Sequence, residues 1–252
     1  MKACVLFRDS VAYRREVFRA GLTRLGYEIV ERPLTNPAKD DLLVMWNRNP
    51  HEEHFARPYV NVGAKIAVSE NGYVGKDEKG HKLFALALDH HNGAGRWNVG
   101  NDRRWKKELD PYRTDGDFLL ILPQRGIGER GIAMDRYWIQ TVSTKLARMT
   151  KRPIKIRHHP GMSKTDPYDA LRGAWAAVTW GSGAAIKALV AGVPVFHGLP
   201  GWIGAPAAVC LEGANIEEPF LGDRLPMFER LAWAQWSVAE VESGEAFACL
   251  LG

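Results

Sequence analysis

The sequence predicts an α/β protein whose strands lie mainly in parallel sheets. Short runs rich in valine, isoleucine and leucine alternate with helical stretches, and most of them end at glycine, proline or polar turns. At 252 residues the chain can form one large α/β domain or two smaller ones. Residues 92–117 are rich in glycine, asparagine, arginine and tryptophan without a clear period, which is typical of a linker. We therefore expect two Rossmann-like domains, residues 1–112 and 113–252.

The composition is that of a soluble globular protein, with 46% apolar and 25% charged residues. No apolar run approaches the roughly 20 residues that a membrane-spanning helix needs. The N-terminal stretch MKACVLFRDS becomes polar too early for a signal peptide. Cys4, Cys210 and Cys249 are too few and too scattered for a disulfide framework or a zinc site. These features predict a cytoplasmic protein.

The net charge of +5 is unevenly distributed along the chain. Basic residues prevail up to residue 205, whereas residues 206–252 carry 2 basic and 8 acidic side chains. A basic body favours a polyanionic partner, such as a nucleotide, a nucleic acid or an acidic glycan. The alternative is a solvated surface with a modest excess of lysine and arginine.

Residues 153–198 contain two adjoining motifs that suit an anion. A β-branched run ends at Arg157-His158-His159-Pro160, and the next apolar run ends at Gly181-Ser182-Gly183, before an alanine-rich helix. In a parallel sheet both turns lie at the carboxyl ends of strands, where ligands bind. One turn offers cationic and imidazole donors, and the other offers a helix N-terminus, so together they predict a phosphate site. The alternative is a pair of ordinary turns.

The order of short motifs from residue 66 onward resembles the bacterial capsule polysaccharide biosynthesis proteins, a family that includes Kdo transferases. The stretches that carry this resemblance are Glu70-Asn71-Gly72-Tyr73, Leu119 to Gln124, Arg157 to Pro160, Trp180 to Val195 and Trp202 to Ala205. The resemblance implies a GT-B glycosyltransferase, with two Rossmann-like domains facing each other across a cleft. It also implies a nucleotide-sugar donor and no metal or other cofactor. A CMP-linked donor is implied, with UDP left open.

The resemblance further implies that the second domain binds the donor. The donor-binding residues expected from it and from the two turns are Gln124, Arg157, His159, Pro160, Ser182 and Gly183. Asn71 stands where the family has an aspartate, so Glu70 is the carboxylate that remains from that motif. Ile186-Lys187 occupy a region where the family usually has a glutamate, which puts identical donor recognition in doubt.

Glu70 and Asp89 are the expected catalytic residues, since each follows an apolar run of the first domain. Either carboxylate can act as a general base on an acceptor hydroxyl, or as a nucleophile if the sugar keeps its configuration. The alternative is a loop carboxylate that caps its own turn. His90 and His91 follow Asp89, but neighbouring residues of a strand point to opposite faces, so we expect no metal site there.

Trp97, Arg104 and Trp105 are the expected acceptor-binding residues, because aromatic and cationic side chains alternate in this loop-like stretch. The acceptor predicted from them is an acidic glycan or a hydroxymethylated base in DNA, which would have to be flipped out of the duplex. The alternative for these residues is packing between the domains.

Two further functions remain open at this point. Residues 126–131 spell G-x-G-x-x-G, the glycine pattern of a dinucleotide site, and an NADP-dependent oxidoreductase would use it. Pro123, Gln124 and Arg125 separate the glycines from the strand, unlike in a true fingerprint. Asn71 would also suit a non-catalytic protein of the same fold that binds sugar or nucleic acid.

Overall fold

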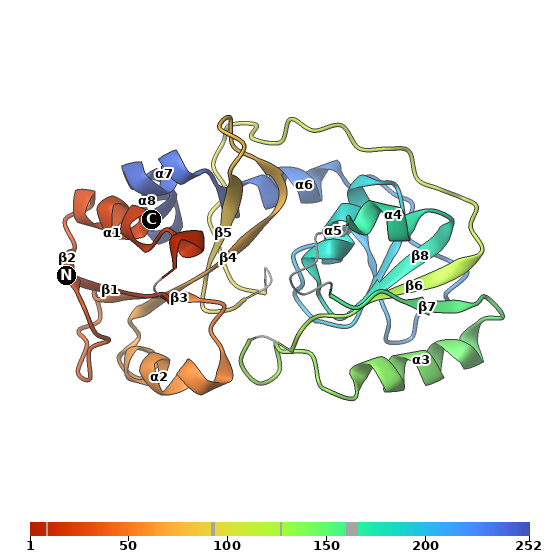
Figure 1. Ribbon diagram of the computed structural model, residues 1–252, viewed down its shortest axis with the longest axis horizontal. Helices are drawn as coiled ribbons and strands as arrows, with labels where there is room; N and C mark the ends of the chain where they lie inside the picture. The colour runs from red at the N-terminus through yellow and green to blue at the C-terminus, as the bar shows by residue number, and fades with distance from the viewer. Residues whose placement is uncertain (9, 92–93, 127, 160–165) are drawn as a thin grey trace. The chain divides into compact units, whose positions relative to one another are not determined.

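The computed structural model describes residues 1–8, 10–91, 94–126, 128–159 and 166–252, and it divides into two compact units (Figure 1). Unit 1 comprises residues 1–104, 127–130 and 230–252, and unit 2 comprises residues 105–126 and 131–229. The sequence placed the division near residue 112 and assigned the entire C-terminal stretch to the second domain. In the structure, residues 230–252 pack with the N-terminal unit instead.

Unit 1 is built on a six-stranded sheet with the order β11-β5-β4-β3-β1-β2. Its strands are β1 (Lys2–Leu6), β2 (Glu28–Val30), β3 (Leu42–Trp46), β4 (Lys65–Lys76), β5 (Lys82–Leu88) and β11 (Gln235–Trp236). The first four run parallel, whereas β5 is antiparallel to both β4 and β11. One face carries α1 (Arg15–Arg24), α7 (Val238–Ser243) and α8 (Glu245–Leu251), and the other carries α2 (Glu53–Val62) (Figure 1).

Unit 2 is built on a five-stranded, fully parallel sheet with the order β10-β9-β8-β6-β7. Its strands are β6 (Phe118–Leu122), β7 (Ile154–Ile156), β8 (Ala174–Thr179), β9 (Val195–His197) and β10 (Val209–Cys210). Its helices are α3 (Trp138–Met149) on one face, α4 (Pro167–Leu171) and α5 (Gly183–Val190) on the other, and α6 (Leu225–Ala232), which leads back to unit 1 (Figure 1). Since β7 and β8 lie on opposite sides of β6, the strand order reverses between β6 and β8. This is the topological switch point, where ligands bind in such sheets.

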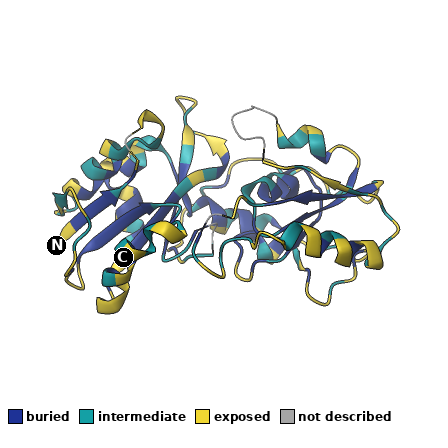
Figure 2. Ribbon diagram, turned by 60° about the horizontal axis from the view of Figure 1, so that its bottom comes forward, coloured by how far each residue is buried: buried dark blue, intermediate teal, exposed yellow. Residues whose placement is uncertain are grey.

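The predicted α/β class is confirmed, because both sheets are mainly parallel and carry helices on both faces. The apolar runs form the buried strands, as the dark blue colour in Figure 2 shows. All five residues of β6 are buried, and so are the first four of β3. Near-continuous apolar runs are typical of strands covered on both faces. None of the helices in the described ranges is long and apolar enough to span a membrane.

The first helical stretch consists of two separate elements. Ser10 caps a 3₁₀ turn at Val11–Tyr13, and α1 begins only at Arg15. Arg14 separates the two with a φ of 49°, in the left-handed region that interrupts a right-handed helix.

The stretch 69–75 was expected to be a loop after a short strand, but it continues β4 to Lys76. The extended strand pairs with β5, with a register shift between Asn71 and Lys76. Gly72 permits this pairing, because a Cβ there would lie 2.7 Å from the Cβ of Leu83. Glu70 therefore lies within a strand rather than in a loop.

Two elements were missed. The helix α2 contains Pro58, a residue that disfavours a helix interior. The strand β11 has only two residues, and Gln235 of this strand binds β4 through its side chain. Its Oε1 accepts from the backbone N–H groups of Tyr73 and Val74, at 3.1 and 3.2 Å, and its Nε2 donates to the Val74 carbonyl.

Candidate functional site

Thr179, the last residue of β8, holds the turn at the switch point of unit 2. Its hydroxyl donates to the Leu122 carbonyl at the end of β6 (2.8 Å) and accepts from the Ser182 N–H (2.9 Å). Ser182 then caps α5 by accepting from the Ala184 N–H at 3.2 Å. The Ala184 N–H, expected to face an anion, is therefore used by the cap. This turn presents two donors to a ligand. They are the backbone N–H of Gly183, the first residue of α5, and the hydroxyl group of Ser182.

Cationic side chains gather near the carboxyl end of β7. His159 is solvent-exposed, and Arg125 and Arg157 lie close enough to act on it electrostatically. Partial burial, followed by the charges of these two arginines, lowers the pKa of His159 below its ordinary 6.5. At neutral pH the ring is therefore neutral and offers one N–H. An anion placed here would compensate the positive charges of the two arginines and accept a hydrogen bond from the N–H of His159.

Gln124 lies just after β6, beside the Thr179 turn. Its Oε1 accepts from the Met134 N–H at 2.9 Å. Its Nε2 is buried and has no hydrogen-bond partner within the described residues. A buried donor without a partner is costly, so this amide is suited to a ligand's acceptor group. Pro160, also predicted to bind the donor, lies outside the described residues.

The glycine pattern 126–131 does not form a dinucleotide-binding turn. Gly126 and Gly131 have positive φ angles of 67° and 93°, and the helix α3 starts only at Trp138. In a dinucleotide fingerprint the glycine loop opens directly into the helix whose N-terminus receives the pyrophosphate. Six residues separate Gly131 from the start of α3, which argues against the NADP-dependent oxidoreductase.

In unit 1, Glu70 lies at the centre of a small hydrogen-bonded cluster. Its Oε1 accepts from the Tyr73 hydroxyl at 2.8 Å, and its Oε2 lies 3.0 Å from Nε2 of His91. The Tyr73 ring is buried, and burial followed by the nearby Glu70 charge raises the pKa of the phenol well above its ordinary value. Tyr73 therefore remains a donor at any physiological pH. The Glu70 side chain is 15% exposed, so it is not completely enclosed.

Asp89, the second predicted catalytic residue, is engaged differently. Its carboxylate binds the Arg96 guanidinium at 2.7 and 2.9 Å, and its φ of 72° places it in a left-handed turn after β5. The Arg48 guanidinium binds both the Asp89 carbonyl and the Glu53 carboxylate. Asp89 thus resembles a turn-forming carboxylate, and Glu70 is the better-placed candidate base.

The three predicted acceptor-binding residues are used in packing. Trp97 is buried, donates its indole N–H to the Arg230 carbonyl (3.1 Å) and lies under the Arg230 guanidinium. Arg104 binds Glu240 at 2.6 Å and stacks over the rings of Trp233 and Trp236. Trp105, in unit 2, is also buried, and its ring centroid lies 4.5 Å from that of Phe228. Trp97 and Arg104 contact the C-terminal segment 230–252, whereas Trp105 packs against Phe228 within unit 2. These contacts agree with packing, the alternative to acceptor binding.

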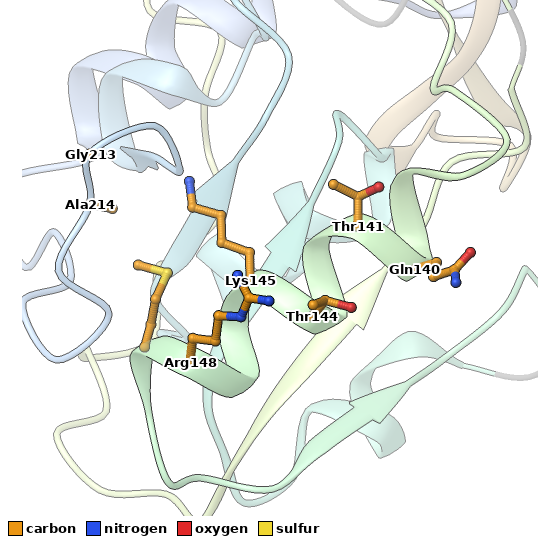
Figure 3. A pocket seen from close by; sticks show the side chains of 8 residues that line it. Gln140, Thr141, Thr144, Lys145, Arg148, Gly213 and Ala214 are labelled. Atoms are coloured by element: carbon orange, nitrogen blue, oxygen red, sulfur yellow. The ribbon is translucent and has the colours of Figure 1, made fainter.

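A shallow groove of about 720 Å³ runs along α3 in unit 2 (Figure 3). Its lining residues are Gln140, Thr141, Thr144, Lys145, Arg148, Met149, Gly213 and Ala214. The Lys145 ammonium is occupied by the Leu211 carbonyl at 2.7 Å. None of these residues belongs to the turns after β6, β7 and β8, so the groove is separate from the candidate anion site. Among the described residues, no group of three or more histidine, cysteine or acidic side chains is placed to hold a metal ion.

Two residues of the candidate site were not predicted, Thr179 as the anchor of the turn and His91 as the partner of Glu70. Thr179 ends a predicted strand, and a hydroxyl in that position is a signal that sequence reasoning can use. No sequence signal pairs His91 with Glu70, because the pairing depends on the turn after β5.

The sequence matches no protein-family model and no curated protein. The fold, however, is similar to solved structures over nearly the whole chain. One is Thermosulfurimonas dismutans KpsC, beta Kdo 2,7 transferase, with 13% identity, a TM-score of 0.57, and coverage of 98% of this chain and 99% of that chain. Another is Thermosulfurimonas dismutans KpsC, beta Kdo 2,4 transferase, with 15% identity, a TM-score of 0.52, and coverage of 93% and 90%. The resemblance to Kdo transferases that the motifs indicated therefore extends to the fold of the entire chain.

Proposed function

We propose that this protein is a glycosyltransferase of the GT-B type that transfers a sugar from a nucleotide-sugar donor to a glycan hydroxyl. The observation that carries the proposal is the turn at the switch point of unit 2. There Thr179 fixes the Ser182-Gly183 turn against the end of β6, and Gln124 lies beside it. A helix N-terminus at a switch point is suited to a phosphate group. The fold shared with Kdo transferases supports the same chemistry.

In the proposed reaction, unit 2 binds the donor nucleotide and unit 1 supplies the base. Glu70 takes the proton of the acceptor hydroxyl while the acceptor oxygen bonds to the anomeric carbon. The bond from this carbon to the phosphate oxygen breaks, and its electron pair leaves with the nucleotide. Arg157 and His159 neutralise the charge that develops on the leaving phosphate. No metal takes part in this scheme, and a CMP-linked sugar is the first donor to test, with UDP the second.

The acceptor is proposed to be an acidic glycan. A hydroxymethylated base in DNA would need exposed aromatic side chains for stacking. Trp97 and Trp105, on which that possibility depended, are both buried. A protein of this fold that binds sugar without catalysis is the second candidate, since Asn71 replaces an acidic residue of the related motif.

Nucleotide binding by two variants of Ser182 tests the donor site. Ser182→Ala removes the hydroxyl and costs about 1 kcal/mol as a lost helix cap, whereas Ser182→Gly removes the same hydroxyl at only a few tenths. If Ser182 contacts the phosphate, both variants weaken CMP or UDP binding by about tenfold in calorimetry, although only the alanine variant loses much stability. Release of free nucleotide from the matching sugar donor then distinguishes the enzyme from the non-catalytic binder. Binding of NADP alone, unaffected by either variant, would refute the proposal.

A further inference from the structure

His91 is a buried titratable side chain that contacts the candidate base. Only 5% of its surface is exposed, and its Nε2 lies 3.0 Å from Oε2 of Glu70. Its Nδ1 is buried and has no hydrogen-bond partner within the described part of the chain. Of the two ring nitrogens, Nε2 is therefore the one with a hydrogen-bond partner among the described residues, and this partner is Glu70.

The chemistry of the pair fixes the direction of the hydrogen bond. An ionised carboxylate can only accept, so the imidazole donates its Nε2–H. Nδ1 has no partner among the described residues, so the surroundings favour the tautomer that carries its proton on Nε2.

The two oxygens of Glu70 thus receive one donor each, Oε1 from Tyr73 and Oε2 from His91. The other charged groups of this region are engaged with partners of their own: Arg48 with Glu53, Asp89 with Arg96, and His90 with Glu129. A carboxylate held from two sides keeps a single orientation, which is what a base must have to meet an acceptor hydroxyl.

We infer that His91 is a positioning residue, which together with Tyr73 orients the Glu70 carboxylate for proton transfer. The inference rests on the proposed function for its catalytic consequence. Its structural core, an Nε2–H donated from His91 to Glu70, does not depend on the sugar or on the acceptor. The turn at Asp89 serves this arrangement, because its left-handed backbone reverses the chain so that His91 returns to β4.

Three variants test the inference in the full chain. His91→Leu removes the donor, whereas His91→Gln keeps an N–H close to the position of Nε2. His90→Leu is the matched control, because the neighbouring histidine binds Glu129 rather than Glu70. We expect His91→Leu to lower kcat by about 10- to 100-fold, the effect of one hydrogen bond to a charged group. KM for the donor should stay within about threefold, and His91→Gln should recover most of kcat. A glutamine variant as impaired as the leucine variant, or a leucine variant as active as wild type, would overturn the inference.

Nitrogen-15 NMR of the histidine rings provides a readout that does not require turnover. We expect His91 to carry a proton on Nε2 and none on Nδ1. The Nε2 proton should be protected from exchange with solvent in the wild type, and this protection should be lost in Glu70→Ala. If the wild type releases no nucleotide from any donor, the proposed function fails, but this spectrum still decides whether the pair exists. A His91 protonated on Nδ1 alone would refute the positioning role even in an active enzyme.

Discussion

The two units share an α/β architecture but present opposite chemistry near their candidate sites. In unit 2 the strand ends carry Arg157, His159 and a helix cap at Ser182, groups that attract negative charge. In unit 1 the candidate site is a carboxylate within β4, Glu70, which accepts hydrogen bonds from Tyr73 and His91. One unit is therefore suited to hold an anion and the other to accept a proton. A group transfer from a phosphate leaving group needs both.

The contrast also separates binding from catalysis. Changes in unit 2 should act on the affinity for nucleotide, whereas changes around Glu70 should act on turnover and leave that affinity intact. A uniform effect of one substitution on both quantities would mean that the two units do not divide the work in this way.

Glu70→Gln should have the largest effect. The amide keeps the size of the side chain but cannot take a proton, so we expect kcat to fall by about 10²- to 10⁴-fold. Nucleotide affinity, measured by calorimetry, should change by less than about twofold. Asp89→Asn is the matched control, because asparagine tolerates the left-handed backbone at this position. Comparable losses in both variants would contradict the assignment of Glu70 as the base.

How much of this arrangement the sequence could predict depends on whether the interactions are local or join distant parts of the chain. Strands such as β6 follow from continuous apolar runs, and the cap at Ser182 follows from a hydroxyl residue before an alanine-rich helix. These signals are local. The Glu70–His91 pair is not, because it depends on the antiparallel register of β4 and β5 and on a left-handed residue that is not glycine. Strand alternation argued against a shared metal site at His90 and His91, but it gave no partner for His91.

The sequence left acceptor binding and packing as alternatives for Trp97, Arg104 and Trp105, and it could not choose between them for a related reason. The composition of residues 92–117 is typical of an exposed linker, and nothing local shows that a distant segment covers it. The final 23 residues do so, since β11 joins the sheet of unit 1 beside β5. Arg104 and Trp97 then meet partners more than 130 positions away.

The pH dependence of nucleotide binding should show a smaller effect, carried by His159. Burial and the two arginines lower its pKa in the free protein, and a bound phosphate would raise it again. Binding then takes up a proton, so affinity should increase as the pH falls from the bound pKa toward the free one. We expect an increase of several-fold between about pH 7.5 and 5.5, beyond any change in His159→Gln. The comparison with this variant is needed because CMP titrates near pH 6 itself. Equal pH profiles would remove His159 from the anion site.

Arg104→Met should have the smallest effect on activity. It tests whether Arg104 serves packing within unit 1 rather than acceptor binding. Methionine keeps much of the apolar stem but loses the bond to Glu240 and the stacking on Trp233 and Trp236. For a partly buried ion pair with cation–π contacts, we expect the free energy of unfolding to fall by about 1–2 kcal/mol. Acceptor KM and nucleotide affinity should remain unchanged, because the side chain braces the C-terminal segment rather than a ligand. A tenfold rise in acceptor KM at unchanged stability would mean that Arg104 binds the acceptor. The region that Arg104 shares with the C-terminal segment would then contribute to acceptor binding as well as to stability.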